Sequence, residues 1–169
     1  MPDSAHWHPP IKRHRSLQPF SRDHYTGLVQ AQRLLKSAEG SAARRHSALT
    51  SFQTAWQEEI APHFADEERL LIPLMRSDDV DRLTREHTAL RSLALEVDSH
   101  AQAVDPPSEF VRQLGQRLND HIRWEERELF PRIEQAASAE ALEWLAPLTA
   151  AMEVQRPRSQ SASRESPQT

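Results

Sequence analysis

The sequence predicts an all-α protein: an up-down-up-down four-helix bundle with a basic N-terminal arm and a short C-terminal fifth helix. The 169 residues include only three Gly and are rich in Ala, Leu, Arg, Glu and Gln, which favour helices over strands. Apolar residues recur at helical spacing along four long segments. Short polar turns join these segments, so an antiparallel bundle is the most economical arrangement.

Three regions follow from composition. Residues 1–19 are predicted to form the arm, because they are rich in Pro, His and Arg and show no helical period. Residues 20–152 carry the helical pattern and form the bundle. Residues 153–169 are rich in Arg, Ser, Gln and Pro, which is typical of a disordered tail. The arm contains three histidines that we expect to lie in solvent: His6, His8 and His14.

The first two helices of the bundle are predicted over 22–38 and 41–76. Ser21 is a suitable N-cap for the first helix, and His24 lies on its apolar stripe. The second helix contains Pro62, which lacks a backbone N–H and clashes with the preceding turn. We therefore expect a kink or break directly before the histidine that follows Pro62.

The remaining helices are predicted over 79–103, 109–136 and 139–152. His87 lies among the apolar residues of the third helix, whereas His100, near its end, is expected at the surface. The fifth and shortest helix is rich in Leu and should cover one side or end of the bundle.

Two stretches of the chain share the pattern H-x-x-x-E-E-R-x-L-[I/F]-P, at 63–73 and 121–131. A helix turns by about 100° per residue, so a His and a Glu four positions apart lie about 40° apart on one face. Each stretch therefore directs an imidazole and a carboxylate to one point: His63 with Glu67, and His121 with Glu125.

Both pairs lie within apolar stripes, so they should face the core. Burying a carboxylate without a partner costs several kcal/mol, and two such pairs facing one interior need a shared cation. A bundle whose buried polar groups merely pair with one another is the simpler alternative. The predicted cluster adds one histidine from each of the other two helices: His24, His63, Glu67, His87, His121 and Glu125.

The chain has no Cys, so any metal must be bound through nitrogen and oxygen. Imidazole and carboxylate suit iron, manganese, zinc and copper, and six ligands exceed what one tetrahedral zinc uses. Two metals bridged by the carboxylates fit better, although a single metal or zinc stays open. No Gly-x-Ser-x-Gly elbow, His-Glu-x-x-His motif or Gly-rich phosphate loop is present. Paired carboxylates acting as acid and base would not require four histidines.

The order of these residues and the Leu-[Ile/Phe]-Pro endings resemble the hemerythrin-like (HHE) cation-binding domain over about residues 20–136. The resemblance implies a non-haem di-iron centre with an oxo or hydroxo bridge and one position for a small ligand. By the same resemblance, His24 and His63 would serve one iron and His87 and His121 the other. The two bridging carboxylates would be Glu67 and Glu125.

The chain departs from the family pattern at two places. Oxygen carriers have a second histidine on the third helix, but the flanking positions here are Leu83 and Arg91. Some relatives have Glu directly after the second-helix histidine, where this chain has Phe64. Glu126 also competes with Glu125, which is favoured because it shares the face of His121. The missing ligand would be water or one of four side chains: Glu86, Glu128, Glu59 or Tyr25.

The resemblance implies a protein that binds or senses dioxygen, peroxide or nitric oxide, and a binding protein more than an enzyme. A di-iron enzyme acting on peroxide and a structural-metal or iron-responsive regulatory bundle are the alternatives. Basic ends leave the middle of the chain acidic, which argues against a nucleic-acid groove. The sequence has neither a membrane-span-length apolar run nor a signal-peptide core, so a cytoplasmic protein is expected. No protein partner is indicated.

Overall fold

The computed structural model describes residues 12–155, which fold into helices with no strand among them. The helices in chain order are α1 (Gln18–Ala38), α2 (Ala42–Ala55), η1 (Trp56–Ile60), α3 (Ala61–Leu70), η2 (Ile72–Leu74), α4 (Ser77–Ala101), α5 (Ser108–Trp124), η3 (Glu125–Leu129), α6 (Phe130–Ala136) and α7 (Ala139–Gln155).

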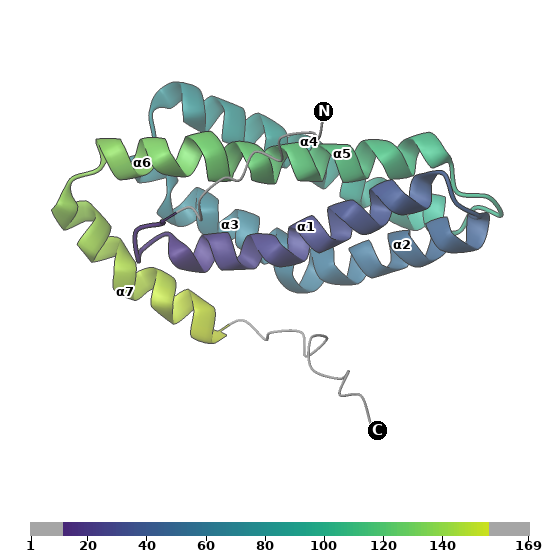
Figure 1. Cartoon of the computed structure of the whole chain (residues 1–169), viewed down its shortest axis with the longest axis horizontal. Coiled ribbons are helices and arrows are strands. Elements are labelled where there is room, and N and C mark those ends of the chain that lie inside the picture. Colours follow the sequence, from purple (N-terminus) through teal and green to yellow (C-terminus); the bar gives the residue numbers. More distant parts are fainter. Residues whose placement is uncertain (1–11, 156–169) are drawn as a thin grey trace, which may run out of the picture.

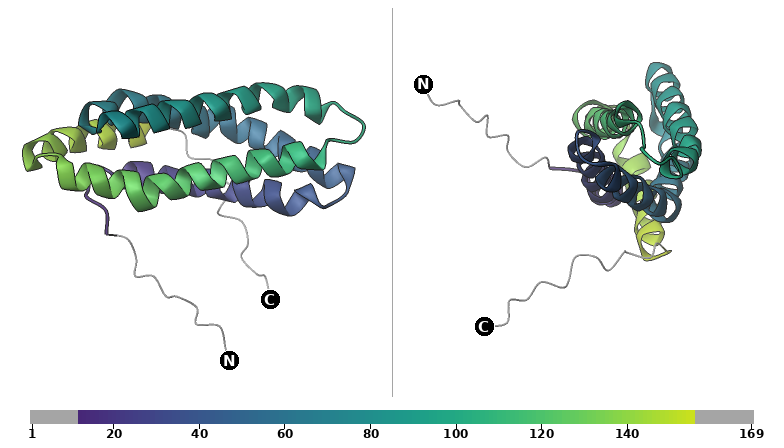
Figure 2. Two further views of the ribbon diagram at one scale, coloured as in Figure 1. Left: turned by 90° about the horizontal axis from the view of Figure 1, so that it is seen from above. Right: turned by 90° about the vertical axis from the view of Figure 1, so that its right-hand side faces the viewer.

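The long helices lie side by side along the longest axis of the molecule (Figures 1 and 2). α1 packs against α5 and α2, and α2 packs against α4. α7 follows α6 at one end of the bundle and packs against α1 (Figure 1). The predicted all-helical bundle is therefore confirmed, whereas its up-down-up-down order stays a prediction.

The start of α1 differs from the sequence prediction. The helix begins at Gln18, one turn earlier than expected and inside the predicted arm. Pro19 explains this start, because its fixed φ angle and missing N–H suit the first turn of a helix. Ser21 is therefore not the N-cap but lies within α1.

The prolines Pro62 and Pro131 are accommodated by π-turns rather than by breaks. The residue before each proline donates its N–H five positions back, from Ala61 to Trp56 and from Phe130 to Glu125. The helix containing Pro62 consequently runs without interruption from α2 through η1 into α3. It ends earlier than predicted, because η2 takes over within the Ile-Pro-Leu segment.

The core consists of two apolar clusters. One centres on Leu34, Phe52, Phe64 and Leu114, and the other on Phe20, Leu83, Phe130 and Leu145. Phe64 stacks on His87 with ring centroids 3.8 Å apart, and Phe130 stacks on His24 at 5.4 Å. The predicted histidines are thus contacted by aromatic rings from both clusters.

Gly115 lies where α5 packs tightly against α1. A Cβ atom at this position would lie 3.0 Å from each of three atoms: the Ala31 carbonyl oxygen, Leu34 Cβ and Leu35 Cγ. Gly115→Ala is expected to force these helices apart, cost about 1–3 kcal/mol and lower Tm by several degrees. Thermal unfolding checks this, with exposed Arg117→Ala on the same helix as control. An unchanged Tm would mean that the helix pair repacks freely.

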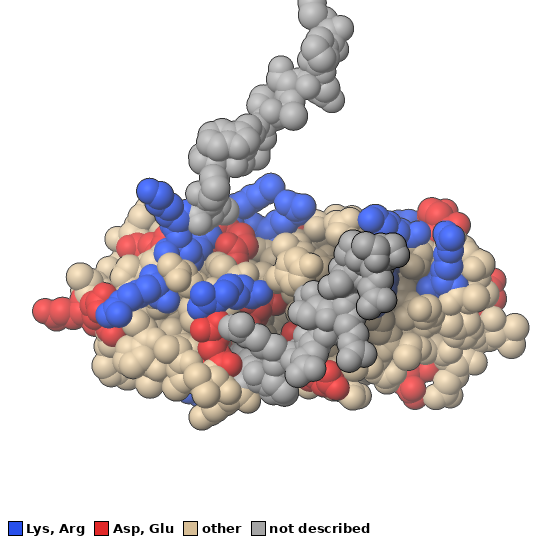
Figure 3. Space-filling view, turned by 60° about the horizontal axis from the view of Figure 1, so that its bottom comes forward, with Lys and Arg blue, Asp and Glu red and all other residues tan. Residues whose placement is uncertain are grey.

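Several predictions concern the ends and the surface of the chain. The predicted disordered tail and the arm histidines His6 and His8 lie outside the described residues, except that 153–155 continue α7. His14 is half-buried rather than in solvent. No helix within residues 12–155 is long and apolar enough to cross a membrane. Acidic and basic side chains are interspersed over the face shown in Figure 3.

Candidate metal centre

The structure brings the six predicted site residues together in the interior of the bundle. Each is at most 4% exposed. They form two groups that share both carboxylates, and within each group the potential ligand atoms all lie within 4.8 Å of one another. The first group is His24, His63, Glu67 and Glu125; the second is Glu67, His87, His121 and Glu125.

Glu67, on α3, lies between the two histidine pairs. Its Oε1 is 3.1 Å from Nε2 of His63 and 3.6 Å from Nε2 of His24. Its Oε2 is 3.4 Å from Nε2 of His87. One carboxylate therefore directs one oxygen to each pair.

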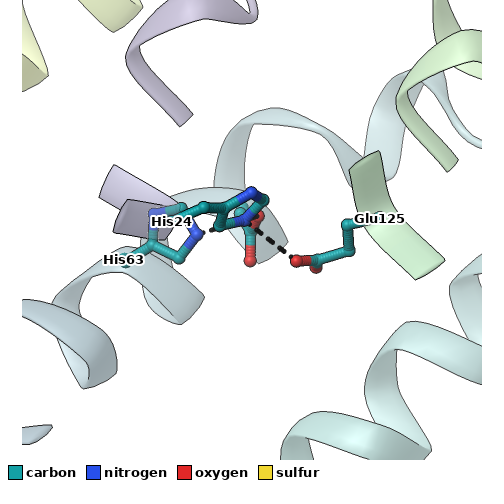
Figure 4. Close-up of side chains that lie close together, drawn as sticks. His24, His63 and Glu125 are labelled. Atoms are coloured by element: carbon teal, nitrogen blue, oxygen red, sulfur yellow. Dashed lines mark ion pairs between the residues drawn. The ribbon is translucent and has the colours of Figure 1, made fainter. Parts of the chain in front are cut away.

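Glu125, the first residue of η3, repeats this arrangement from the opposite side. Its Oε2 lies 3.0 Å from Nε2 of His24, and its Oε1 lies 3.1 Å from Nε2 of His121 and 3.9 Å from that of His87. Figure 4 shows Glu125 reaching toward His24 and His63. Glu125, like Glu67, therefore directs one oxygen to each histidine pair.

The donor atoms fit a metal better than they fit one another. Among the described residues, both oxygens of Glu67, both oxygens of Glu125 and the Nε2 atoms of His24 and His63 are buried without a hydrogen bond. The Nε2 atoms of His87 and His121 face each other at 3.2 Å. Buried polar atoms in proteins are nearly always satisfied, so this concentration of donor atoms fits a bound cation. Nitrogen and oxygen donors of this kind suit iron, manganese and zinc.

Each of the four histidines also directs its Nδ1 atom to a second carboxylate on a neighbouring helix. Such contacts orient a metal-ligating imidazole and keep the metal-facing nitrogen unprotonated. We call these four acids the outer carboxylates. The pairs are His24 with Glu126 at 2.6 Å, His63 with Asp23 at 3.3 Å, His87 with Glu68 at 2.8 Å, and His121 with Glu86 at 2.9 Å.

The sequence did not predict the supporting role of the outer carboxylates, two of which, Glu86 and Glu126, were expected only as alternative ligands, although a signal was present. Every one of them is the immediate sequence neighbour of a cluster residue: Asp23 precedes His24, Glu86 precedes His87, and the second Glu of each Glu-Glu pair follows the first. Neighbours on a helix differ by about 100°, so while one faces the centre the other faces the adjacent helix. This geometry separates the roles of Glu125 and Glu126.

The residues suggested as an additional ligand are engaged elsewhere. Besides Glu86, which holds His121, Glu128 pairs with Arg132, Glu59 accepts a hydrogen bond from Thr26, and Tyr25 is 69% exposed. Arg91, at a position where oxygen carriers would have histidine, binds the outer carboxylate of Glu68 instead. None of these residues adds a ligand to the cluster, so each of the two groups contains two imidazoles and the two shared carboxylates.

A family profile described as the hemerythrin HHE cation-binding domain matches residues 22–133. The chain belongs to this family. The match covers well over half of the chain and contains all six cluster residues, while residues 12–21 and α7 of the hemerythrin-like protein lie outside it. No curated protein and no solved structure matches the chain. Family membership makes this a cation-binding domain, and the His and Glu cluster is its candidate metal site.

Charge pairing dominates the metal-free state of the hemerythrin-like cluster. Burial lowers the pKa of His87, but Glu125 and Glu67 raise it to about 9. Burial also lowers the pKa of His24 and of His121, but the neighbouring glutamates outweigh it and raise both pKa values above the ordinary value. Burial raises the pKa of the central glutamates, yet the histidines hold the pKa of both Glu67 and Glu125 below the ordinary range. Without metal, protons on the imidazoles therefore balance the carboxylates.

The stability of the metal-free protein is expected to depend on pH in a defined direction. The pKa of His87 is raised from 6.5 to about 9, so its stabilising contribution is complete below pH 6.5 and is lost as pH rises through 9. The lowered pKa of Glu67 adds stability above its ordinary value of 4.5 that is lost in acid. Metal-free Tm should therefore peak between about pH 5 and 6.5.

Thermal unfolding of chelator-treated protein across pH 4 to 10 checks this expectation. The fall in Tm from pH 6.5 to 9 should be on the order of 5 °C or more. His46→Gln, which changes a half-buried histidine away from the cluster, should leave the profile unchanged. A flat profile would mean that the cluster carries no bound protons at neutral pH.

Proposed function

We propose that this hemerythrin-like protein holds two iron ions in its cluster and binds or senses dioxygen, or a related molecule such as peroxide or nitric oxide. One observation carries the proposal: Glu67 and Glu125 each direct one oxygen to each histidine pair. That arrangement suits two cations bridged by carboxylates better than a single ion. The proposal includes the up-down-up-down order of the helices and a cytoplasmic location.

Iron would supply reversible redox chemistry and an open coordination position. The protein contributes the orientation of the donors. Each outer carboxylate accepts a hydrogen bond from Nδ1, which leaves the Nε2 lone pair free to bind metal. Four His and two Glu also leave fewer protein donors than two six-coordinate ions use, so water or a small exogenous ligand has room to bind.

The space beside the first histidine pair favours a small ligand. A cavity of about 10 Å³ lies next to His24 and His63 and is lined by apolar side chains, including Ile60 and Leu118, and by the carboxylates of Asp23 and Glu59. This volume is about that of one water-sized probe. A diatomic molecule is compatible with such a space after small side-chain movements, whereas a larger organic substrate is not.

The experiment that tests the proposal is elemental analysis of untagged protein, together with visible spectra in air and after anaerobic reduction. We expect about two irons per chain. We also expect an absorption band that changes reversibly with oxygen, because oxygen would bind at an open position of the bridged iron pair. One zinc per chain would contradict the di-iron proposal. Sustained peroxide turnover that Glu67→Ala abolishes would instead favour an enzyme, and two irons with no ligand-dependent spectrum would favour a structural metal.

A further inference from the structure

The described part of the N-terminal arm packs against the metal-site end of the bundle. Arg13 has a side chain only 5% exposed, and Ser16 and Leu17 are fully buried. The backbone N–H of His14 donates to Glu134 of α6 at 2.7 Å. The described residues of the arm are therefore an ordered part of the fold.

The Arg13 guanidinium reaches the candidate metal centre through one of the outer carboxylates. Its Nη2 donates to the side-chain Oε2 of Glu126 at 2.8 Å and to the main-chain oxygen of the same residue at 2.7 Å. The other side-chain oxygen of Glu126 accepts from Nδ1 of His24 at 2.6 Å. A continuous chain of charge-assisted hydrogen bonds thus joins the arm to His24.

A second contact links the same residues independently. The Arg13 guanidinium carbon lies 5.3 Å from the centre of the Phe130 ring, and that ring stacks on His24 with planes 12° apart. The imidazole of His24 is therefore supported on its face by Phe130 and at Nδ1 by Glu126, and Arg13 contacts both supports.

We propose that Arg13 is a positioning residue for His24, so that the arm forms part of the metal centre. This inference rests on the proposed function. Two other outer carboxylates are also held by arginines, Glu68 by Arg91 and Glu86 by Arg82, but those arginines belong to α4 within the bundle. Arg13 lies outside the segment that the family profile matches.

The proposal predicts an asymmetric effect. Without Arg13, Glu126 loses the partner that fixes its carboxylate, and His24 loses its orientation. The pair His24 and His63 should then hold metal less firmly. His87 and His121 take their support from Glu68 and Glu86 and should be unaffected.

The test measures iron release to a colorimetric chelator from Arg13→Met, with Arg15→Met as the matched control. Arg15 lies in the same arm, but it is exposed and pairs with Glu143 of α7. We expect Arg13→Met to release one of its two irons about 10-fold faster than the wild type and the other at the wild-type rate. Loss of a group that supports a metal ligand typically weakens metal binding by about 10–100-fold, and this expectation is at the lower end of that range. Release of both irons at the wild-type rate, or equal acceleration of both, would overturn the proposal.

A double-variant comparison adds a readout that general destabilisation would not reproduce. If Arg13 acts through Glu126 rather than through the Phe130 ring, then Arg13→Met combined with Glu126→Gln should release iron no faster than Glu126→Gln alone. Additive acceleration would contradict the proposed route. If Arg13→Met folds poorly, Arg13→Lys keeps the charge but not the planar donor pair, and it should show the same selective release at a smaller magnitude.

A measurement on metal-free protein separates this inference from the di-iron proposal. The Nδ1–H of His24, observed by nitrogen-edited NMR, should exchange with water at least about 10-fold faster in Arg13→Met, because its hydrogen-bonded partner is freed. The Nδ1–H of His87 should be unchanged. Unaltered exchange at His24 would overturn the positioning role, whereas wild-type protein that takes up no iron would overturn only the proposed function.

Discussion

Glu67→Gln is expected to abolish stable iron binding, from about two ions per chain to nearly none. The substitution removes the negative charge that faces three histidines. It also replaces one of the two carboxylate oxygens with an NH2 group, so the side chain cannot bridge two metal ions. Loss of a ligand shared by both positions should weaken binding by more than the roughly 10–100-fold that follows loss of a supporting group. Elemental analysis after gel filtration provides the measurement.

The chain offers two matched controls for this substitution. Glu68→Gln changes the adjacent residue, which supports His87 rather than facing the centre, and should weaken binding by the smaller factor of roughly 10–100. Glu58→Gln changes an exposed side chain in η1 and should have no effect. Equal iron content in Glu67→Gln and Glu58→Gln would refute the assignment of Glu67 as a ligand.

Removing iron from the wild-type protein is expected to lower its Tm by about 10 °C at neutral pH. A ligand present at 1,000 times its dissociation constant stabilises the folded state by about 4 kcal/mol, and each kcal/mol shifts Tm by about 2–4 °C in a chain of this size. The physical source is the set of buried carboxylate oxygens and imidazole nitrogens that have no hydrogen bond without metal. Differential scanning fluorimetry with and without chelator measures the shift.

Glu67→Gln supplies the control for the metal-removal experiment as well. A variant that holds no iron should show the same Tm before and after chelation, so any remaining shift would come from the chelator itself. The difference should also widen from pH 6.5 to 9, because the metal-free protein loses the contribution of protonated His87 over that range. A wild-type Tm insensitive to chelation would argue against a resident metal.

The six cluster residues could be predicted from sequence because their arrangement is largely local. A His and a Glu four positions apart share a helical face whatever surrounds them, and two copies of one pattern require a common explanation. His24 and His87 followed from their places on apolar stripes. The structure places all six within two groups, and the two histidine pairs are those that the resemblance to the hemerythrin-like domain implies.

The supporting contacts could not be predicted in the same way. Which histidine Glu86 or Glu126 meets depends on how adjacent helices are rotated and offset, and no local pattern records that. The same limit applies to Arg13, which was assigned to an arm by composition although its partner lies 113 positions away. The start of α1 was misplaced because Ser21 is a favourable N-cap residue and Pro19 was assigned to the arm.

The outer carboxylates also link the helical segments to one another in chain order. Three of these contacts join one long helical segment to the next: Asp23 to His63, Glu68 to His87, and Glu86 to His121. The fourth contact joins Glu126 of η3 to His24 of α1, 102 positions earlier, and so connects the last of these segments to the first. A nascent chain that has not yet released η3 from the ribosome therefore lacks both Glu125 and the support of His24. Both groups of candidate ligands therefore become complete only once η3 has joined the bundle, so stable metal binding is expected to follow folding of the whole domain.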